Sequence, residues 1–200
     1  IKNQQHILKK LGIEQLNAMQ LETQKSIETN SETILLSPTG TGKTLAFLLP
    51  LVAQLDENLN EVQVLILAPS RELAIQIEQV AREMGSGFKT NVVYGGRAIS
   101  KDKVELQHPP AMLIGTPGRV ADHLRRNTFS IDSIKTLVLD EFDKSLEIGF
   151  EAEMAEIARL LPNVRKKILT SATQGVSIPA FVGLKNPTII NYLAEGVRDL

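Results

Sequence analysis

The segment at residues 37–44 reads SPTGTGKT and brings glycines, a lysine and hydroxyl side chains close together. Gly40 and Gly42 allow backbone amides to wrap a phosphate, and Lys43 can reach the β and γ phosphates of a nucleotide. The hydroxyl of Thr44 can ligate Mg2+ where a helix begins. The strict pattern has glycine at the first position, where this chain has serine, so a simple tight turn is the alternative interpretation.

A cluster of acidic residues follows the apolar run TLVL at residues 136–139, namely Asp140, Glu141 and Asp143. Carboxylates at the end of a buried strand are costly unless they face a cation or a hydrogen-bond donor. Asp140 suits the Mg2+ of a nucleotide, directly or through water, and Glu141 suits orienting or deprotonating the attacking water. This pair indicates hydrolysis, whereas the alternative is a solvated turn that opens the next helix.

Short β-rich runs alternate with segments of helical periodicity along the chain. Several runs are continuously apolar, which indicates a parallel sheet covered by helices on both faces. The predicted strands are 33–37, 63–68, 90–94, 111–115, 136–140, 167–171 and 188–191, and the predicted helices are 43–55, 71–84, 99–107, 117–126, 151–161 and 177–184. Because ligands bind beyond the carboxyl ends of such strands, we expect both motifs at one edge of the sheet.

The composition favours a single domain over residues 1–200. A hydrophobic content of 42% can bury one core, and the longest apolar run, 45–55, is too short to span a bilayer. The chain has no cysteine, which suits a reducing compartment, so we expect a cytoplasmic protein. With 22 Lys and Arg against 23 Asp and Glu, binding to nucleic acid would rely on backbone amides and a few placed cations.

Seven short motifs make the chain resemble the first RecA-like domain of a DEAD-box ATP-dependent RNA helicase, over nearly its whole length. In the family's order they are Gln20 in LNAMQ, SPTGTGKT at 37–44, APSRELA at 68–74, GG at 95–96, TPGR at 116–119, DEFD at 140–143 and SAT at 171–173. Each motif alone is weak, but the ordered set is specific. The resemblance implies an α/β RecA-like fold with a mainly parallel sheet, and ATP and Mg2+ as cofactors.

The resemblance also implies a role for each matched residue. ATP would be bound by Gln20, which reads the adenine edge, and by Thr39, Gly40, Thr41, Gly42, Lys43 and Thr44; Mg2+ would be held by Thr44 and Asp140, and catalysis would use Lys43, Asp140 and Glu141. An RNA track would comprise Ser70, Arg71, Gly95, Gly96, Thr116 and Arg119, which contact phosphates without reading sequence. Asp143, Ser171 and Thr173 would couple the ATP site to this track.

Structural interpretations of the same residues stay open. Gln20 could be an ordinary surface residue, Arg71 and Glu72 could form an ion pair at a helix start, and TPGR could be only a turn before a helix. Two positions depart from the family pattern. Phe142 replaces alanine and should pack into the core, and Ile13 replaces an aromatic residue, so the group that stacks on adenine is not identified.

Our prediction is the ATP-binding half of an RNA-dependent ATPase that locally separates short RNA duplexes. A DNA-directed helicase, a nucleic-acid clamp without turnover and a small-molecule P-loop kinase are the alternatives. Intact Lys43, Asp140 and Glu141 argue against the clamp, and Glu141 argues against the kinase. The resemblance implies that a second RecA-like domain supplies arginines to the γ-phosphate. The closing stretch at 191–200 reads as the start of a connection, so residues 1–200 alone should fold, bind nucleotide weakly and lack RNA-stimulated turnover and unwinding.

Overall fold

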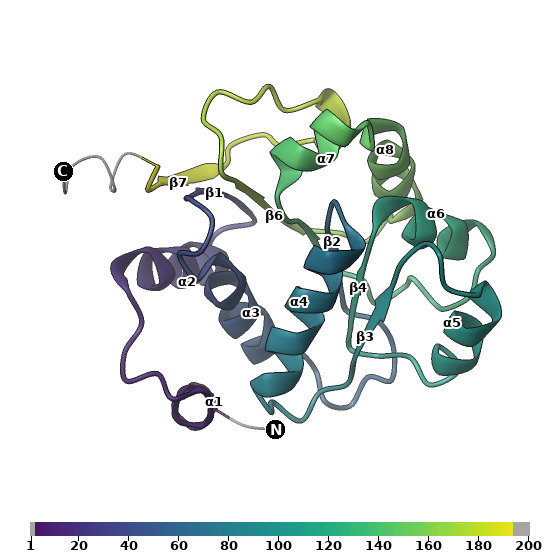
Figure 1. Ribbon diagram of the computed structural model, residues 1–200, viewed down its shortest axis with the longest axis horizontal. Coiled ribbons are helices and arrows are strands. Elements are labelled where there is room, and N and C mark those ends of the chain that lie inside the picture. Colours follow the sequence, from purple (N-terminus) through teal and green to yellow (C-terminus); the bar gives the residue numbers. More distant parts are fainter. Residues whose placement is uncertain (1–2, 194–200) are drawn as a thin grey trace.

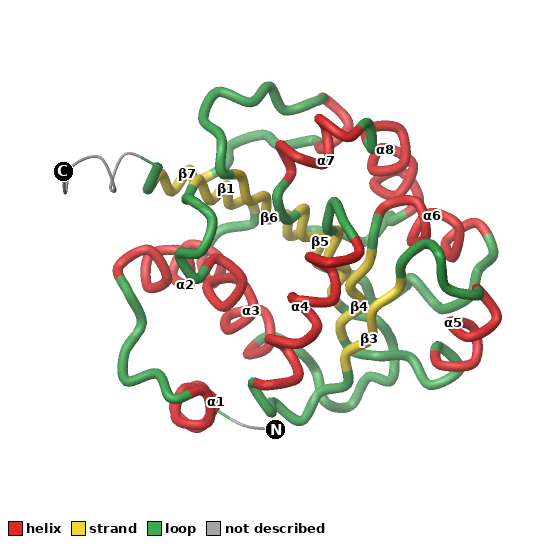
Figure 2. Tube along the Cα trace, in the orientation of Figure 1, coloured by secondary structure: helices red, strands yellow, loops and turns green. Residues whose placement is uncertain are grey.

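The computed structural model describes residues 3–193, and their centre is one parallel sheet with strand order β3-β4-β2-β5-β6-β1-β7 (Figure 2). The strands are β1 Glu32–Leu36, β2 Val64–Leu67, β3 Thr90–Val93, β4 Met112–Gly115, β5 Thr136–Leu139, β6 Lys166–Ser171 and β7 Thr188–Asn191. Each predicted strand is confirmed, and no strand end differs from its predicted position by more than one residue. The stretch at 194–200, interpreted as the start of a connection, lies outside the described residues.

Helices cover both faces of the sheet (Figure 1). They are α1 Gln4–Leu11, α2 Ala18–Thr29, α3 Lys43–Ala53, α4 Arg71–Glu83, α5 Ile99–Glu105, α6 Pro117–Arg125, α7 Phe142–Ile148, α8 Glu151–Leu160 and the 3-10 helix η1 Ala180–Val182. Alternate strand residues enter two cores: Ile66 and Ile114 pack with α1 to α4, and Leu65 and Leu113 pack with α6 to α8. The predicted α/β fold with helices on both faces is confirmed. None of these helices is long and apolar enough to cross a membrane.

The helix predictions fail at the two ends of the chain and after the acidic cluster. The segment 177–184 forms only the single turn η1, because Pro179 disfavours a helical backbone at Ile178 and Gly183 ends the turn with a φ of 69°. In contrast, α1, α2 and α7 were not among the predicted helices. The first two begin at the asparagine N-caps Asn3 and Asn17, whose side chains accept a backbone hydrogen bond.

The strand register aligns the motif-bearing ends of the central strands. In the β1–β6 pair Leu36 lies opposite Ser171, and in the β5–β6 pair Leu139 lies opposite Leu169. The glycine-rich loop therefore follows β1, the acidic cluster follows β5, and SAT begins at the end of β6. Strands β2, β4 and β3 occupy the other half of the sheet. The motif APSRELA follows β2, TPGR follows β4, and GG comes shortly after β3.

Gly115, the last residue of β4, has no room for a side chain. A Cβ atom there would lie 2.6 Å from Cγ2 of Val120, 2.7 Å from Cγ2 of Val93 and 2.8 Å from the Val93 carbonyl oxygen. We predict that Gly115→Ala lowers the free energy of unfolding by about 1–3 kcal/mol, measured by urea denaturation. Gly118→Ala is the matched control, because a Cβ at Gly118 meets no atom within 4 Å. An equal loss in both variants would contradict the steric explanation.

Candidate functional site

The predicted phosphate cradle is the loop that joins β1 to α3. Gly40 and Gly42 have φ values of 83° and 88°, in the left-handed region that favours glycine. Thr39 and Gly40 are exposed, and Thr44 lies half-buried in the first turn of α3 beside Lys43. The loop therefore presents open backbone at the N-terminus of a helix, where amide groups favour a phosphate.

The serine at the first position of the motif is built into the loop. The buried hydroxyl of Ser37 lies 2.7 Å from Oγ1 of Thr41, which in turn donates to the Pro38 carbonyl oxygen at 2.8 Å. These bonds hold the first half of the loop in a closed turn. The side chain of Thr41 therefore shapes the cradle. The loop accommodates serine instead of glycine at position 37, because the Ser37 hydroxyl has a partner in Thr41.

Lys43 is the strongest indication that the loop receives an anion. It is the first residue of α3 and is only 8% exposed, yet its buried Nζ has no hydrogen-bond partner among the described residues. A buried ammonium without a partner is unfavourable. A phosphate in the cradle would satisfy it, so the residues present fit the phosphates of ATP.

Asp140 lies at the end of β5, and only 3% of it is exposed. The hydroxyl of Thr170 donates to Oδ1 of Asp140 and also accepts from the backbone amide of Glu141 at 2.9 Å. Burial raises the pKa of Asp140 to about 6, and the hydrogen bond from Thr170 and the charge of Lys43 oppose this rise. A cation would offset the cost of burying this carboxylate, so Asp140 and the cradle residue Thr44 have side chains of the kind that fit the Mg2+ of a nucleotide.

Glu141 has an unusual backbone conformation for a residue with a side chain. Its φ and ψ are 48° and 51°, in the left-handed region, immediately before α7 begins. One carboxylate oxygen of Glu141 lies 3.1 Å from Nζ of Lys144, in the first turn of α7. Strained conformations of this kind persist where the surrounding structure fixes them, and here the Thr170 hydroxyl holds the Glu141 amide.

The predicted coupling residues come together across the ends of β5 and β6. The hydroxyl of Thr173 donates to Oδ2 of Asp143 at 2.8 Å, so Asp143 has the hydroxyl partner that the sequence led us to expect. Ser171 does not contact Asp143. Its hydroxyl instead accepts from the Thr173 amide at 3.0 Å and donates to the Thr173 carbonyl oxygen at 2.9 Å. Ser171 therefore positions Thr173.

Gln20 lies beside the cradle rather than on an open surface. Its Nε2 donates to the Gly42 carbonyl oxygen at 3.2 Å, and its Oε1 accepts from the amide of Asn17 at 3.0 Å. Asn17 also donates to the Thr41 carbonyl oxygen at 3.2 Å. A primary amide has two donor hydrogens and two acceptor lone pairs, so one of each remains for an adenine edge. The adenine role of Gln20 stays a prediction.

The residues predicted for the RNA track begin after β2. The side chain of Ser70 caps α4 by accepting from the Leu73 amide at 3.1 Å. Arg71 is exposed, lies 5.7 Å from the ring centre of Tyr94 and is 3.8 Å from a carboxylate oxygen of Glu72. The contact between Arg71 and Glu72 is weak at this exposure. The guanidinium therefore remains accessible to a phosphate.

The ends of β3 and β4 supply the next part of the track. Gly95 and Gly96 are exposed, and a Cβ atom at either would meet nothing within 4 Å, so the backbone there is open to a ligand. Thr116 is the N-cap of α6 but makes no side-chain cap hydrogen bond. Its hydroxyl is therefore free to contact a phosphate. Because β3 and β4 pair in parallel, these groups lie at one edge.

Arg119 is arranged differently from the expectation for an RNA contact. Its guanidinium is only 11% exposed and donates to Oδ2 of Asp102 at 2.8 Å and to the Arg97 carbonyl oxygen. Asp102 is fully buried and also bonds Nε2 of His123 at 2.9 Å. Arg119 therefore ties the chain after Gly96 to α6, and a phosphate would have to compete with Asp102 for it.

Comparison with known proteins places these motifs in a family. Residues 17–180 match the family model described as DEAD/DEAH box helicase. The chain belongs to the DEAD/DEAH box helicase family. It is 39% identical over 168 residues to the ATP-dependent RNA helicase CshA of Limosilactobacillus reuteri, a match that covers 83% of this chain and 34% of that protein.

Two further DEAD-box proteins extend the comparison. The chain is 36% identical over 188 residues to DEAD-box ATP-dependent RNA helicase 6 of Oryza sativa subsp. japonica, covering 92% of this chain and 38% of that protein. The chain thus spans little more than a third of the length of these curated relatives. Its fold is similar to the crystal structure of a DEAD box protein from Methanococcus jannaschii, with a TM-score of 0.83, 29% identity, and coverage of 98% of this chain and 55% of that chain. The expected RecA-like fold is confirmed.

The structure explains one departure from the DEAD-box pattern and adds residues that the motifs do not contain. Phe142 is 2% exposed and packs in the core under α6 to α8, as predicted. Ile13 packs against the core on the other face. Sequence analysis missed Thr170 and Asp102. Thr170 directly precedes SAT at a strand end, and this place in the sequence could have marked it as a site residue. Asp102 is one of several charged residues in a helix, and nothing in the sequence distinguishes it from the others.

The raised pKa of Asp140 gives the folded state a defined pH dependence. Between the ordinary pKa of 3.8 and about 6, the folded protein holds a proton that the unfolded chain releases, so stability falls as the pH rises through this window. We predict that Asp140→Asn, in EDTA at pH 7.5, raises the free energy of unfolding by about 1–3 kcal/mol in urea denaturation. The gain should disappear toward pH 4.

Asp132→Asn is the matched control, because Asp132 is exposed and lies before the same strand. It should leave the free energy of unfolding unchanged at both pH values. A gain for Asp140→Asn that is as large at pH 4 as at pH 7.5 would contradict burial of the charge as its cause.

Proposed function

We propose that this chain is the Mg-ATP-binding domain of an RNA-dependent ATPase that locally separates or remodels short RNA duplexes. The observation that carries the proposal is the unpaired, buried Nζ of Lys43 beside the buried carboxylate of Asp140. Membership of the DEAD/DEAH box helicase family and the names of the relatives, which are ATP-dependent RNA helicases, support the class of reaction.

In this proposal, the cradle amides and Lys43 bind the β and γ phosphates. Thr44 and Asp140 would hold Mg2+, partly through water. The Mg2+ would neutralise charge on those phosphates. Glu141 orients the attacking water and accepts its proton. The Nζ of Lys144 lies 3.1 Å from one carboxylate oxygen of Glu141, so this ion pair helps to orient the side chain.

The RNA backbone would cross the ends of β2, β4 and β3 in the proposed complex. Backbone amides at Gly95 and Gly96, the hydroxyl of Thr116 and the exposed guanidinium of Arg71 would contact phosphates, without reading bases. A second RecA-like domain would supply arginines to the γ-phosphate, in keeping with relatives of which this chain matches about a third. ATPase stimulation by RNA compared with DNA of one sequence tests the choice of nucleic acid.

The proposed roles of Lys43 and Glu141 are separable by mutation. In the complete protein, we predict that Glu141→Gln binds ATP as tightly as the wild type but lowers kcat at least about 100-fold, because the water loses its base. Lys43→Ala should weaken ATP binding at least about tenfold, since a charged contact to phosphate is lost. Calorimetric titration and steady-state ATPase assays give the two values.

Lys101→Ala is the control for this experiment, because it removes an exposed lysine on α5, away from the cradle. It should change neither affinity nor turnover. Equal losses of nucleotide affinity in the Glu141 and Lys43 variants would refute this division of roles.

The hydrogen bond between Thr173 and Asp143 provides a test of coupling. Thr173→Val keeps the shape of the side chain but removes the hydroxyl that Asp143 accepts from. In the complete protein, we predict that duplex separation falls about tenfold more than RNA-stimulated ATPase. Thr173→Ser retains the hydroxyl and should retain both activities. If both activities of Thr173→Val fell by the same factor, the coupling role would be abandoned.

A further inference from the structure

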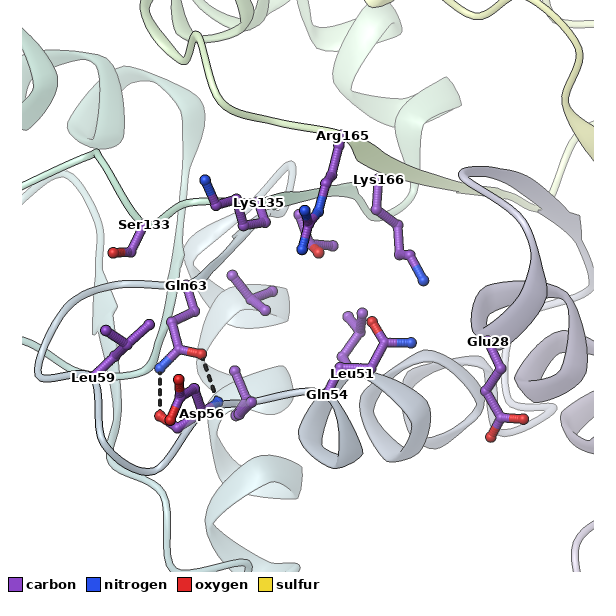
Figure 3. Close-up of a pocket in the computed structure, with 13 residues that line it drawn as sticks. Glu28, Leu51, Gln54, Asp56, Leu59, Gln63, Ser133, Lys135, Arg165 and Lys166 are labelled. Carbon is purple, nitrogen blue, oxygen red and sulfur yellow. Dashed lines mark hydrogen bonds between the residues drawn. The ribbon is translucent and has the colours of Figure 1, made fainter.

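A cavity of about 660 Å3 lies at the edge of the sheet opposite to the phosphate cradle (Figure 3). It is lined by residues at the starts of β2, β5 and β6, at the end of α3 and in the chain that follows α3. None of the motif residues assigned to ATP, RNA or coupling lines it. We propose that this cavity binds a small phosphorylated molecule that has an apolar body.

Three cationic side chains line one wall of the cavity. Lys135 precedes β5, Arg165 precedes β6, and Lys166 is the first residue of β6. The amides of Arg165 and Lys166 both donate to the Lys135 carbonyl oxygen, at 2.9 and 3.0 Å, so the three side chains project from adjacent backbone. Figure 3 shows Arg165 between the two lysines, with its guanidinium directed toward the middle of the cavity.

Most arginines in residues 3–193 lie within 4 Å of an acidic group, but Arg165, like Arg159 in α8, does not. The arginines that have an acidic partner within 4 Å are Arg71, Arg82, Arg97, Arg119, Arg125 and Arg126. Within residues 3–193, neither Lys135, Arg165 nor Lys166 forms such an ion pair. Lys166 donates to the Ile27 carbonyl oxygen, and burial, with the charge of Arg165, lowers its pKa. An anion between the three cations would relieve their mutual repulsion.

The two acidic residues of the lining offset this wall only in part, because the charge of Glu28 opposes the lowering of the Lys166 pKa and neither carboxylate forms an ion pair within 4 Å among the described residues. A carboxylate oxygen of Asp56 accepts from the Asn58 amide at 2.8 Å, and Glu28 accepts from Nε2 of Gln24 at 3.2 Å. Both carboxylates therefore bond locally on their own segments. The side chain of Gln63 bonds the Asp56 amide and carbonyl at 2.8 and 2.9 Å, which fixes the loop between α3 and β2 as a wall.

The opposite side of the cavity is partly apolar, and this determines the kind of anion. Leu55 and Leu59 present apolar surface there, and Leu59 is 40% exposed, whereas Leu51 and Val64 behind them are buried and Gln54 and Asp56 add polar groups. A phosphomonoester could accept two parallel hydrogen bonds from Arg165 while its organic part covers these side chains. The volume is within the range of roughly 300–1,000 Å3 that is usual for small-molecule sites. A phosphate group with an apolar body therefore matches both walls.

Phenyl phosphate is a suitable probe, because it joins a phosphomonoester to an apolar ring. In 1H–15N spectra of the protein, we expect saturable shifts of the amides at 133–136 and 164–167, with a Kd at least about fivefold lower than that of inorganic phosphate. Phenol should cause no saturable shift. Arg165→Ala and Lys135→Ala should each raise the Kd at least about fivefold, and the control Lys101→Ala should leave it unchanged.

Three results would overturn the proposal. The first is a response that does not saturate or that phenol reproduces, and the second is a set of shifts confined to residues 37–44. The third is tighter binding of hexaglutamate than of phenyl phosphate, which would show an acidic-peptide site instead. Because the cavity and the phosphate cradle report through different amides, failure here leaves the proposed ATP site unaffected.

Discussion

The parallel register of the sheet is the constraint on which the rest of the molecule depends. Because all paired strands run in the same direction, every connection from a strand to the following helix passes the same edge. The order β3-β4-β2-β5-β6-β1-β7 then divides that edge. The loops after β3, β4 and β2 form the proposed RNA track, and those after β5, β6 and β1 form the proposed nucleotide site. Residues far apart in the sequence become neighbours without any long loop.

The nucleotide half concentrates groups that are unfavourable in the absence of a ligand. Lys43 is buried without a hydrogen-bond partner, Asp140 has a raised pKa, and Glu141 has a left-handed backbone. A hydroxyl of Thr170 bonds both acidic residues and makes the arrangement possible. The sheet around it is apolar and well packed, so it can tolerate these local penalties. Their common location at one strand edge is the physical signature of a binding site.

The sequence predicted the strands better than the helices, for a physical reason. Continuously apolar strands such as β2 and β5 have a pattern that burial on both faces requires, and their ends were found within one residue. Helix α2 exposes one side and has a mixed composition, so its periodicity is weak, and its capping box is a clearer signal. At 177–184 the apolar pattern suggested a helix, but Pro179 and Gly183 prevented one.

Motif matching proposed the site residues but could not state their partners. The pattern around 140–143 indicated that Asp143 accepts a hydroxyl, and it left open which of Ser171 and Thr173 supplies it. Only the relative position of β5 and β6 shows that Thr173 does so. The Gln20 contact with Gly42 is also invisible in the sequence, because it joins α2 to a loop 22 residues away. Residue types follow from chemistry, but pairings follow from the packed fold.

Arg119 shows how the fold can change what a matched residue is able to do. Asp102 is fully buried, and Arg119 is its closest cationic partner at 2.8 Å, ahead of Arg97 at 3.9 Å. A buried carboxylate that loses such a partner is destabilised. A phosphate would therefore have to compete with Asp102 for the guanidinium. In the proposed RNA track, the contribution of α6 would then come from the hydroxyl of Thr116 and from backbone amides. Arg119, through Asp102 and the Arg97 carbonyl, holds the chain after Gly96 against the start of α6.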